Sequence, residues 1–296
     1  MQAAYRGRFA PAPTGPLHLG SLLTALAGFL QARARGGEWH VRIDDLDTPR
    51  CLPGADSEIL RTLERFGLHW DGPVVYQSQR LERYQAALTQ LERRGYLYRC
   101  VCTRKILRQD GPVYPGRCRG RQIPSDQPHA LRVRVDDTPV VFHDLLQGEF
   151  RVHLPQTCGD FIVRRRDGLH AYQLAVVMDD ADLGVTEVLR GADLLEATPR
   201  QIYLQPLLGL PTPAYCHIPV LVDTRGRKLS KQNGAPPVTA DRPEAVLLQL
   251  LTWLGQDPPA ALGGAPVGEL LAWAVSHWRP QHLPKRRRLA IMPAMP

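Results

Sequence analysis

The 296-residue sequence contains no long apolar run free of charged residues, so we expect no membrane-spanning helix. A membrane-spanning helix needs about 20 consecutive, mostly apolar residues. The segment from Met1 to Phe9 also lacks the apolar core of a secretory signal. We therefore expect a cytoplasmic protein, in which the six cysteines are reduced thiols or metal ligands.

Two further absences narrow the possible architectures and chemistry. The sequence has no internal repeat, so a solenoid is not expected. It also shows no Ser-His-Asp order and no other candidate covalent nucleophile, so nucleophilic catalysis by the protein is not expected. The composition is that of a globular protein, with 44% hydrophobic residues and enough length for two domains. The formal net charge of +8 fits a polyanionic partner such as nucleic acid.

Strand and helix patterns alternate along the first third of the chain. A helix pattern over Leu19–Arg35 ends at Gly36, and a strand pattern over Trp39–Asp44 follows. Further helix patterns cover Ala55–Phe66 and Leu81–Arg94. This alternation predicts an α/β fold with a doubly wound, parallel, Rossmann-type sheet, which binds ligands beyond the carboxyl ends of its strands.

The pattern changes near residue 98, where clustered cysteines, prolines and short strand patterns begin. Ala130–Val135 and Val140–His143 are two such strand patterns. We interpret this segment as an inserted domain that interrupts the sheet domain. The predicted organisation is the first half of the sheet domain at 1–97, the inserted domain at 98–170, the second half at 171–240 and a short helical C-terminal region at 241–296.

The predicted insertion carries the strongest metal signal of the sequence. Cys100, Cys102 and Cys118 lie close together, and three thiolates suit Zn²⁺, which prefers four tetrahedral ligands. The fourth ligand could be Tyr114, His129, His143 or a water. Buried, unreactive cysteines are one alternative. A redox pair is another, although a disulfide within Cys-x-Cys closes a strained ring.

Two short segments suggest a nucleotide site. In the first, a Gly/Pro turn in Pro11–Ser21 joins the apolar run Arg8–Ala10 to the helix pattern. Free N–H groups and the helix dipole make a helix N-terminus attractive to phosphate. His18 and Gly20 lie at this entrance, where glycine lets a nucleotide approach the backbone closely. The alternative is an ordinary strand-loop-helix connection with a buried histidine.

The second segment, Asp223–Lys231, is a basic loop. Its cations are Arg225, Arg227, Lys228 and Lys231, beside glycine and serine. Such a loop can neutralise a triphosphate, or it can be a solvated surface loop. The presence of both segments in one chain, with α/β patterns between them, favours the nucleotide site.

Pro11–Ser21 and Lys228–Gln232 together resemble the paired nucleotide signatures of class I aminoacyl-tRNA synthetases. Six further motifs resemble glutamyl-tRNA synthetases in sequence and order: Arg8–Gly15, Arg42–Asp47, Asp160–Val163, Ala171–Asp180, Val188–Leu195 and Thr198–Gln201. The resemblance covers roughly residues 6–240. The short length and the cysteine cluster with Tyr114 resemble the glutamyl-Q tRNA(Asp) synthetase family, which is similar to the catalytic half of those enzymes.

The resemblance implies ATP-dependent, tRNA-independent activation of L-glutamate to glutamyl-adenylate, followed by transfer to the queuosine base in the anticodon loop of tRNA(Asp). The implied glutamate-binding residues are Arg8, Phe9, Ala10, Pro11, Ala12, Asp44, Tyr172 and Arg190. The implied ATP-binding residues are His18, Gly20, Lys228, Ser230 and Lys231, with His18 and Lys231 also catalytic. The implied ligands of a structural Zn²⁺ are Cys100, Cys102, Tyr114 and Cys118. Mg²⁺ is expected with ATP, and we expect a monomer that binds the anticodon stem-loop.

Residue chemistry is consistent with these roles. Arginine binds carboxylates through two charge-assisted hydrogen bonds of its planar fork. Arg190 interrupts an apolar run and would be costly to bury without an anionic partner, so we expect it to bind the side-chain carboxylate of glutamate. Arg8 is a second candidate clamp, Asp44 is expected to face the ammonium group, and the Tyr172 hydroxyl is a further contact.

Three positions depart from the family pattern. Asp44 stands where most relatives carry Glu, Ala12 where Ser is usual, and Gln232 where the second signature commonly ends in Ser. The shorter side chain sets the carboxylate of Asp44 back by about 1.5 Å. We expect these departures to change substrate affinity more than reaction type. Two other functions stay open: a truncated glutamyl-tRNA synthetase that charges a tRNA 3′ end, and a non-catalytic zinc protein that binds nucleic acid.

Overall fold

The computed structural model describes residues 4–229, 236–238 and 241–291. Its strands are β1 (Arg6–Phe9), β2 (Glu38–Ile43), β3 (Val75–Tyr76), β4 (Leu97–Cys100), β5 (Ala130–Val133), β6 (Val140–Asp144), β7 (Gly148–Val152), β8 (Phe161–Arg164), β9 (Glu187–Gly191), β10 (Ala214–Ile218), β11 (Val220–Val222) and β12 (Arg288–Ala290). Its α-helices are α1 (Leu19–Ala34), α2 (Ala55–Arg65), α3 (Leu81–Arg93), α4 (Arg104–Gln109), α5 (Leu154–Thr157), α6 (Tyr172–Asp182), α7 (Thr198–Leu208), α8 (Pro243–Trp253) and α9 (Val267–Ser276).

The predicted helices agree with α1, α2 and α3 to within one residue at each end. Glycine ends each of them for a shared reason. Gly36, Gly67 and Gly95 follow the three helices with φ of 60°, 68° and 74°, a left-handed backbone that side chains with a Cβ adopt at a cost. The three glycines therefore end the helices where the sequence predicted, because each adopts the left-handed conformation that follows a helix end.

The central sheet strands meet at the middle of the molecule, and all of them pair in parallel except β7, which runs antiparallel to β6. One group has the order β1-β2-β3, and the other has the order β7-β6-β10-β9. β1 lies beside β9, and the Thr186 N–H donates to the Arg6 carbonyl over 2.9 Å where they meet. The strand order reverses between β1 and β9, which is the position where doubly wound sheets bind ligands. The predicted parallel strand pairing is thus confirmed for these strands, with the antiparallel β7 added at one edge.

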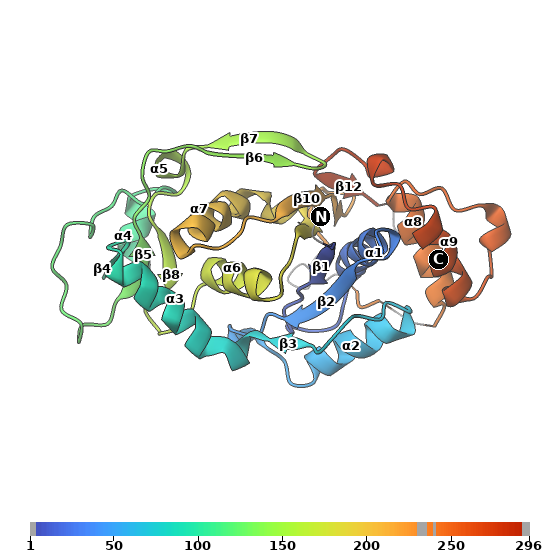
Figure 1. The fold of residues 1–296 in the computed structure, drawn as a ribbon, viewed down its shortest axis with the longest axis horizontal. Coiled ribbons are helices and arrows are strands. Elements are labelled where there is room, and N and C mark those ends of the chain that lie inside the picture. Colours follow the sequence, from blue (N-terminus) through green and yellow to red (C-terminus); the bar gives the residue numbers. More distant parts are fainter. Residues whose placement is uncertain (1–3, 230–235, 239–240, 292–296) are drawn as a thin grey trace.

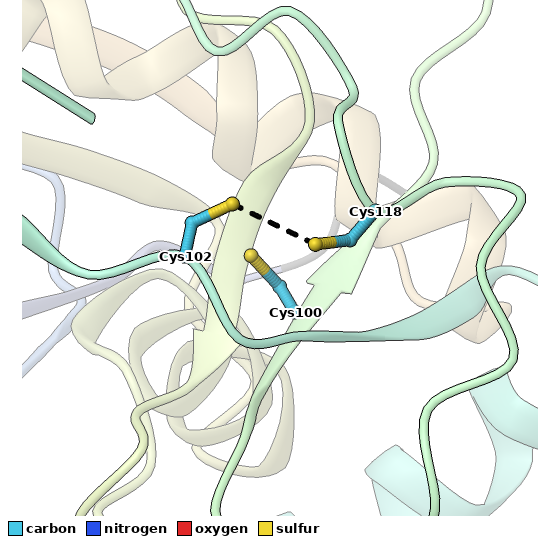
Figure 2. Close-up of side chains that lie close together, drawn as sticks. All are labelled: Cys100, Cys102 and Cys118. Carbon is cyan, nitrogen blue, oxygen red and sulfur yellow. Dashed lines mark hydrogen bonds between the residues drawn. The ribbon is translucent and has the colours of Figure 1, made fainter. Parts of the chain in front are cut away.

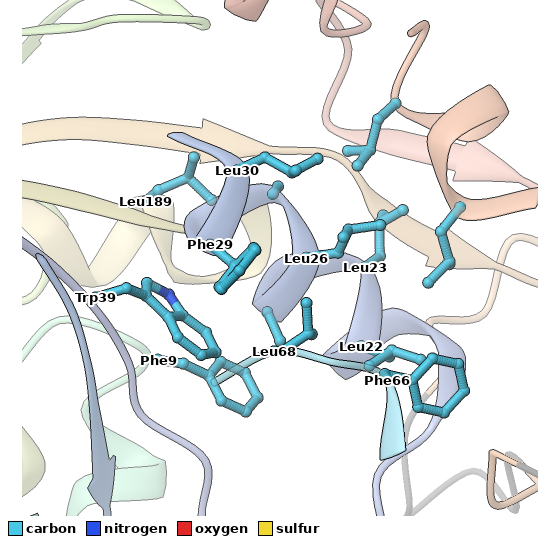
Figure 3. Packing of buried hydrophobic residues seen from close by; sticks show 14 of the residues in the cluster. Phe9, Leu22, Leu23, Leu26, Phe29, Leu30, Trp39, Phe66, Leu68 and Leu189 are labelled. Carbon is cyan, nitrogen blue, oxygen red and sulfur yellow. The ribbon is translucent and has the colours of Figure 1, made fainter. Parts of the chain in front are cut away.

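The main core lies around α1, on one face of the central strands (Figure 3). Trp39 of β2 stacks on Phe9 of β1 with ring centroids 6.2 Å apart, and its edge meets Phe29 of α1 at 5.6 Å. A Cβ on Gly28 would lie 3.0 Å from the Trp39 ring nitrogen, so the small residue lets α1 approach the sheet. This packing fixes the N-terminus of α1 beside the end of β1.

Two peripheral units lie at opposite ends of the elongated molecule (Figure 1). The antiparallel sheet β4-β5-β8 and α4 form one end, and α8 and α9 pack beside α1 at the other. The β6-β7 hairpin, within the predicted insertion 98–170, reaches back along one side and pairs with β10. Part of that segment therefore extends the central sheet, whereas the domain boundaries themselves stay predictions.

No α-helix in the described ranges is long and apolar enough to cross a membrane. This agrees with the lack of long apolar runs in the sequence.

Candidate active site and metal centre

An open cleft of about 1060 Å³ lies at the carboxyl ends of β1, β2 and β9. The predicted residues in its lining are Arg8, Phe9, Ala10, Pro11, Ala12, His18, Gly20, Asp44, Tyr172, Arg190 and Lys228. Ser230, Lys231 and Gln232 lie outside the described residues. The structure thus brings together every described member of the predicted glutamate and ATP sites.

One wall of the cleft is built on a buried network of charges. Arg8 donates to Asp180 of α6 over 3.1 Å, and Arg42 donates to the same carboxylate oxygen over 2.6 Å. Burial works against ionisation of Asp180, but these two guanidinium groups outweigh it and hold its pKa below the usual range. The sequence analysis assigned no role to Arg42 or Asp180, which here fix the side chain of Arg8.

Asp44 lies at the end of β2 with its carboxylate turned toward Arg42. Its two oxygens accept from Arg42 Nε over 2.6 Å and from Nη2 over 3.4 Å. Burial raises the pKa of Asp44 above its usual value despite this partner. The carboxylate of Asp44 is thus held by Arg42 at the lining of the cleft, and its contact with an ammonium group stays a prediction.

Arg190 is 3% exposed on β9 and also lines the cleft. Its Nε donates to His217 Nε2 over 3.0 Å, and its Nη2 donates to the Thr198 hydroxyl over 2.8 Å. Its Nη1 is buried without a hydrogen-bond partner in the described structure. An unpaired, buried donor of a cation carries a large desolvation penalty unless a ligand satisfies it.

His217 connects Arg190 to a buried carboxylate. Its Nδ1 lies 2.5 Å from Asp144 Oδ2, and both side chains are fully buried. Burial lowers the pKa of His217, the charge of Arg190 lowers it further, and the hydrogen bond to Asp144 opposes both. The imidazole is therefore neutral near pH 7, and its two nitrogens have different hydrogen-bonding roles.

We expect the depressed pKa of His217 to make stability depend on pH. An unfolded histidine titrates near about 6.5, so below that pH the unfolded chain binds a proton that the folded chain does not. The charged groups around the ring are Asp144 on β6, Arg190 on β9 and Arg8 on β1. The free energy of unfolding should therefore fall as pH drops from about 7 to 5, by up to about 1.4 kcal/mol per unit from this group. Urea unfolding of wild type and His217→Gln should show a shallower slope for the variant; equal slopes would contradict the assignment.

The entrance to α1 combines the two predicted nucleotide segments. His18 caps the helix, because its Nδ1 accepts from the Ser21 N–H over 3.2 Å, and it also lines the cleft. A Cβ on Gly20 would lie 3.1 Å from the His18 ring and 3.7 Å from the Leu229 carbonyl oxygen. Glycine at this position therefore gives room to the His18 ring, and the end of the described second segment lies in ordinary contact distance of the helix start.

The remaining predicted cleft residues differ in how firmly they are held. Lys228 Nζ donates to Asp193 over 2.5 Å, and both residues line the cleft. Tyr172 begins α6 with 37% of its surface exposed, and its hydroxyl makes no hydrogen bond within the described ranges. Phe9 ends β1, and the loop that follows it contributes backbone and small side chains to the lining.

A second site lies in the insertion, where three cysteine sulfurs converge (Figure 2). The sulfurs all lie within 4.8 Å of one another, and that of Cys102 is 3.6 Å from that of Cys118. The Tyr114 hydroxyl lies 3.5 Å from the sulfur of Cys100 and 3.8 Å from that of Cys102. Four ligands about 2.0–2.3 Å from a Zn²⁺ ion form a tetrahedron with edges of about 3.5–3.8 Å. The donor set therefore fits zinc.

The other candidate fourth ligands lie elsewhere. His129 Nδ1 is engaged with the Gln127 carbonyl at 2.7 Å, and its Nε2 faces Arg164. His143 lies on β6, outside the sheet that carries the cysteines. Tyr114 is also the residue that orders the cluster, since its oxygen accepts from the Cys118 N–H over 3.0 Å.

Comparison with known proteins gives a consistent result. A family model described as "tRNA synthetases class I (E and Q), catalytic domain" matches residues 4–112 and 118–257. A protein named glutamyl-Q tRNA(Asp) synthetase from Ectopseudomonas mendocina is 52% identical over 290 residues, which cover 98% of each chain. One of the same name from Methylococcus capsulatus is 55% identical over 290 residues, 98% of this chain and 96% of the relative.

Solved structures show the same relationship at lower identity. The glutamate-tRNA synthetase from Elizabethkingia anophelis superposes with a TM-score of 0.81 at 26% identity, covering 98% of this chain and 68% of that one. A glutamate tRNA ligase from Elizabethkingia meningosepticum, solved in complex with its amino acid, gives 0.79 at 26% identity, covering 95% of this chain and 66% of that one. The chain belongs to the class I tRNA synthetases, and within them to the family of glutamyl-Q tRNA(Asp) synthetases.

Proposed function

We propose that this protein activates L-glutamate with ATP, without tRNA, and transfers the glutamyl group to the queuosine base in the anticodon loop of tRNA(Asp). The name of its relatives supports the reaction. The observation that carries the glutamate assignment is the buried guanidinium of Arg190, a residue of the cleft lining whose Nη1 has no hydrogen-bond partner in the described structure.

Glutamate matches the charges of this cleft. Its side-chain carboxylate completes the hydrogen bonding of Arg190, and a second carboxylate suits Arg8, whose guanidinium is fixed by Asp180. The cation of Arg190 has no carboxylate within ion-pair distance among the described residues. An anionic amino acid side chain is therefore the natural occupant, and neutral glutamine leaves that charge uncompensated.

Adenylation requires the glutamate α-carboxylate to attack the α-phosphate of ATP as pyrophosphate leaves. The protein contributes positioning and charge stabilisation, with no covalent intermediate on the enzyme. The N-terminus of α1 with His18 binds phosphate, and Lys228 and Lys231 add positive charge, although Lys231 lies outside the described residues. Mg²⁺ bound with ATP supplies further neutralisation of the phosphates.

The decisive experiment is pyrophosphate exchange with each amino acid, with and without tRNA. We expect exchange with glutamate alone and no requirement for tRNA. A strict need for tRNA would contradict tRNA-independent activation, and exchange with no amino acid would leave the protein as a non-catalytic binding protein. The monomeric state and the cytoplasmic location stay predictions.

We further propose that Cys100, Cys102, Tyr114 and Cys118 bind a structural Zn²⁺. A closed set of four protein ligands leaves no open position for catalysis. The site lies at the insertion end of the molecule, on β4 and the loops that follow. Zinc then stabilises the insertion and takes no part in the chemistry.

We expect one zinc per chain in the purified, metal-supplemented protein, and its loss in Cys118→Ser. Cys158→Ser is a matched control, because Cys158 lies in the same insertion outside the cluster. The measurement is metal content by mass spectrometry together with the melting temperature before and after chelation. Absence of stoichiometric zinc in wild type would reject the site, and an unchanged zinc affinity in Tyr114→Phe would reject only the fourth ligand.

A further inference from the structure

We propose that Asp144 and His217 are positioning residues that hold the guanidinium of Arg190 in the orientation that binds the glutamate side chain. This inference rests on the proposed function, since it deepens the assignment of Arg190. Neither residue belongs to the set that the sequence analysis selected, and neither lines the cleft.

The three residues form a row across adjacent strands. The strand order is β6-β10-β9, and Asp144, His217 and Arg190 come from these strands in that order. His217 is the register partner of Arg190, and Asp144 is that of Tyr215, two residues before His217. The β6-β7 hairpin therefore supplies the carboxylate that reaches Arg190 through one imidazole ring.

Asp144 can only accept hydrogen bonds, and its contacts fix it in the ionised form. Its Oδ1 accepts from the N–H groups of Leu146, Gln147 and His217 over 3.1, 2.9 and 3.2 Å. These donors and the His217 ring hold the pKa of Asp144 below its usual range despite burial. With Oδ1 occupied, Oδ2 is the acceptor for His217 Nδ1, so the ring proton lies on Nδ1.

The tautomer determines what Arg190 meets. Because Nδ1 carries the proton, Nε2 of the neutral ring has a lone pair and accepts from Arg190 Nε. The Thr198 hydroxyl accepts from Arg190 Nη2, and it lies 3.2 Å from the Leu194 carbonyl oxygen and 3.1 Å from His217 Nε2, either of which can accept its proton. Two of the three guanidinium nitrogens are thus held, and Nη1 is the one that has no hydrogen-bond partner in the described structure.

The neutral ring also preserves the charge of Arg190. A carboxylate in direct contact would neutralise the guanidinium and compete with the substrate for it. His217 instead lies between Arg190 and Asp144. Its hydrogen bonds let Asp144 orient the guanidinium without a direct ion pair between Asp144 and Arg190. The arrangement therefore favours an anionic ligand over a neutral amide of the same shape.

Asp144→Asn tests the tautomer with almost no change in size. The amide oxygen retains the backbone donors, so the amide nitrogen faces His217 Nδ1 and forces that atom to accept. The proton then moves to Nε2, where it opposes the N–H of Arg190. We expect the KM for glutamate to rise by about tenfold to a hundredfold, with little change in the KM for ATP. Nitrogen-15 NMR of labelled histidine should show the proton on Nδ1 in wild type and on Nε2 in the variant.

Two variants of His217 test the role of the imidazole ring itself. Gln in His217→Gln can place its amide oxygen near the position of Nε2 and should retain most of the glutamate affinity, whereas His217→Leu cannot accept and should lose it. Tyr215→Phe is the matched control, because Tyr215 lies buried on the same strand and its hydroxyl bonds Gln205 instead of Arg190.

The outcomes separate this inference from the proposed function. An unchanged tautomer in Asp144→Asn, or equal glutamate KM values in wild type, Asp144→Asn and His217→Leu, would overturn the positioning role. If wild type shows no exchange with glutamate, the proposed function fails, and the NMR tautomers still decide whether the Asp144-His217 pair orients Arg190. If Asp144→Asn fails to fold, the comparison of His217→Gln with His217→Leu tests the positioning role, and if the His217 variants fail to fold, Asp144→Asn tests it.

Discussion

Arg190→Ala is expected to lower kcat/KM for glutamate in pyrophosphate exchange by about two to three orders of magnitude. Arg190 is buried, it belongs to the cleft lining, and its Nη1 has no hydrogen-bond partner in the described structure. Removing one member of a buried, hydrogen-bonded charge pair typically costs about 2–5 kcal/mol, because the other charge stays buried without a partner. The loss should fall mainly on glutamate use, with the KM for ATP near its wild-type value.

The measurement is the exchange rate over a range of glutamate concentrations, with folding checked by the melting temperature. Arg190→Lys should recover only a small part of the activity, because lysine keeps the charge but lacks the planar fork. Arg33→Ala is the matched control, since Arg33 pairs with Asp71 outside the cleft. If Arg190→Ala and Arg33→Ala have the same KM for glutamate, Arg190 does not bind the side-chain carboxylate of glutamate.

The parts of the site that the sequence predicted are local in the chain. The turn before α1, the end of β2 and the apolar run around Arg190 each form one short segment with its own pattern. The strand-helix alternation predicted a phosphate site at the turn before α1, because ligands bind beyond the ends of parallel strands. The glutamate-binding residues were assigned through the resemblance of these short segments to family motifs, and the structure places the described ones in one cleft.

The supporting residues were missed because they depend on long-range pairing. Asp144 and His217 are 73 residues apart, and they meet only through the pairing of β6 with β10. Val140–His143 was predicted as a strand, but no local signal shows that it joins the central sheet instead of the insertion. Asp180 belongs to the family motif Ala171–Asp180, but nothing in the sequence indicated a role for it, because its partner Arg8 lies 172 residues away in the chain.

The fourth zinc ligand also could not be chosen from the sequence without the three-dimensional structure. Residue chemistry alone left Tyr114, His129 and His143 open, because each can coordinate a metal. Tyr114 lies in the long segment between α4 and β5, which has no periodic pattern to position it. Only the three-dimensional arrangement brings its hydroxyl within 3.5 Å of the Cys100 sulfur.

The largest expected effect concerns the acceptor: labelled glutamate should be transferred to tRNA(Asp) only when the anticodon loop carries queuosine. The relatives with this name match the chain over nearly its full length. The cyclopentenediol of queuosine offers hydroxyls, as a terminal ribose does, so the same attack on the adenylate forms an ester. Arg104, Lys105 and Arg108 are exposed on α4, within the predicted insertion, and can contact phosphates. Binding should therefore weaken steeply with salt.

Four substrates test this prediction: tRNA(Asp) with or without queuosine, each with an intact 3′ end or with the terminal nucleotide removed. We expect labelling of both queuosine-containing tRNAs, no labelling above background of the other two, and recovery of the label in the anticodon fragment after ribonuclease cleavage. Arg190→Ala serves as the enzyme control, because it should abolish labelling whichever hydroxyl is the acceptor. Labelling that follows the terminal nucleotide and ignores queuosine would instead identify a synthetase that charges the 3′ end, with glutamate activation itself unchanged.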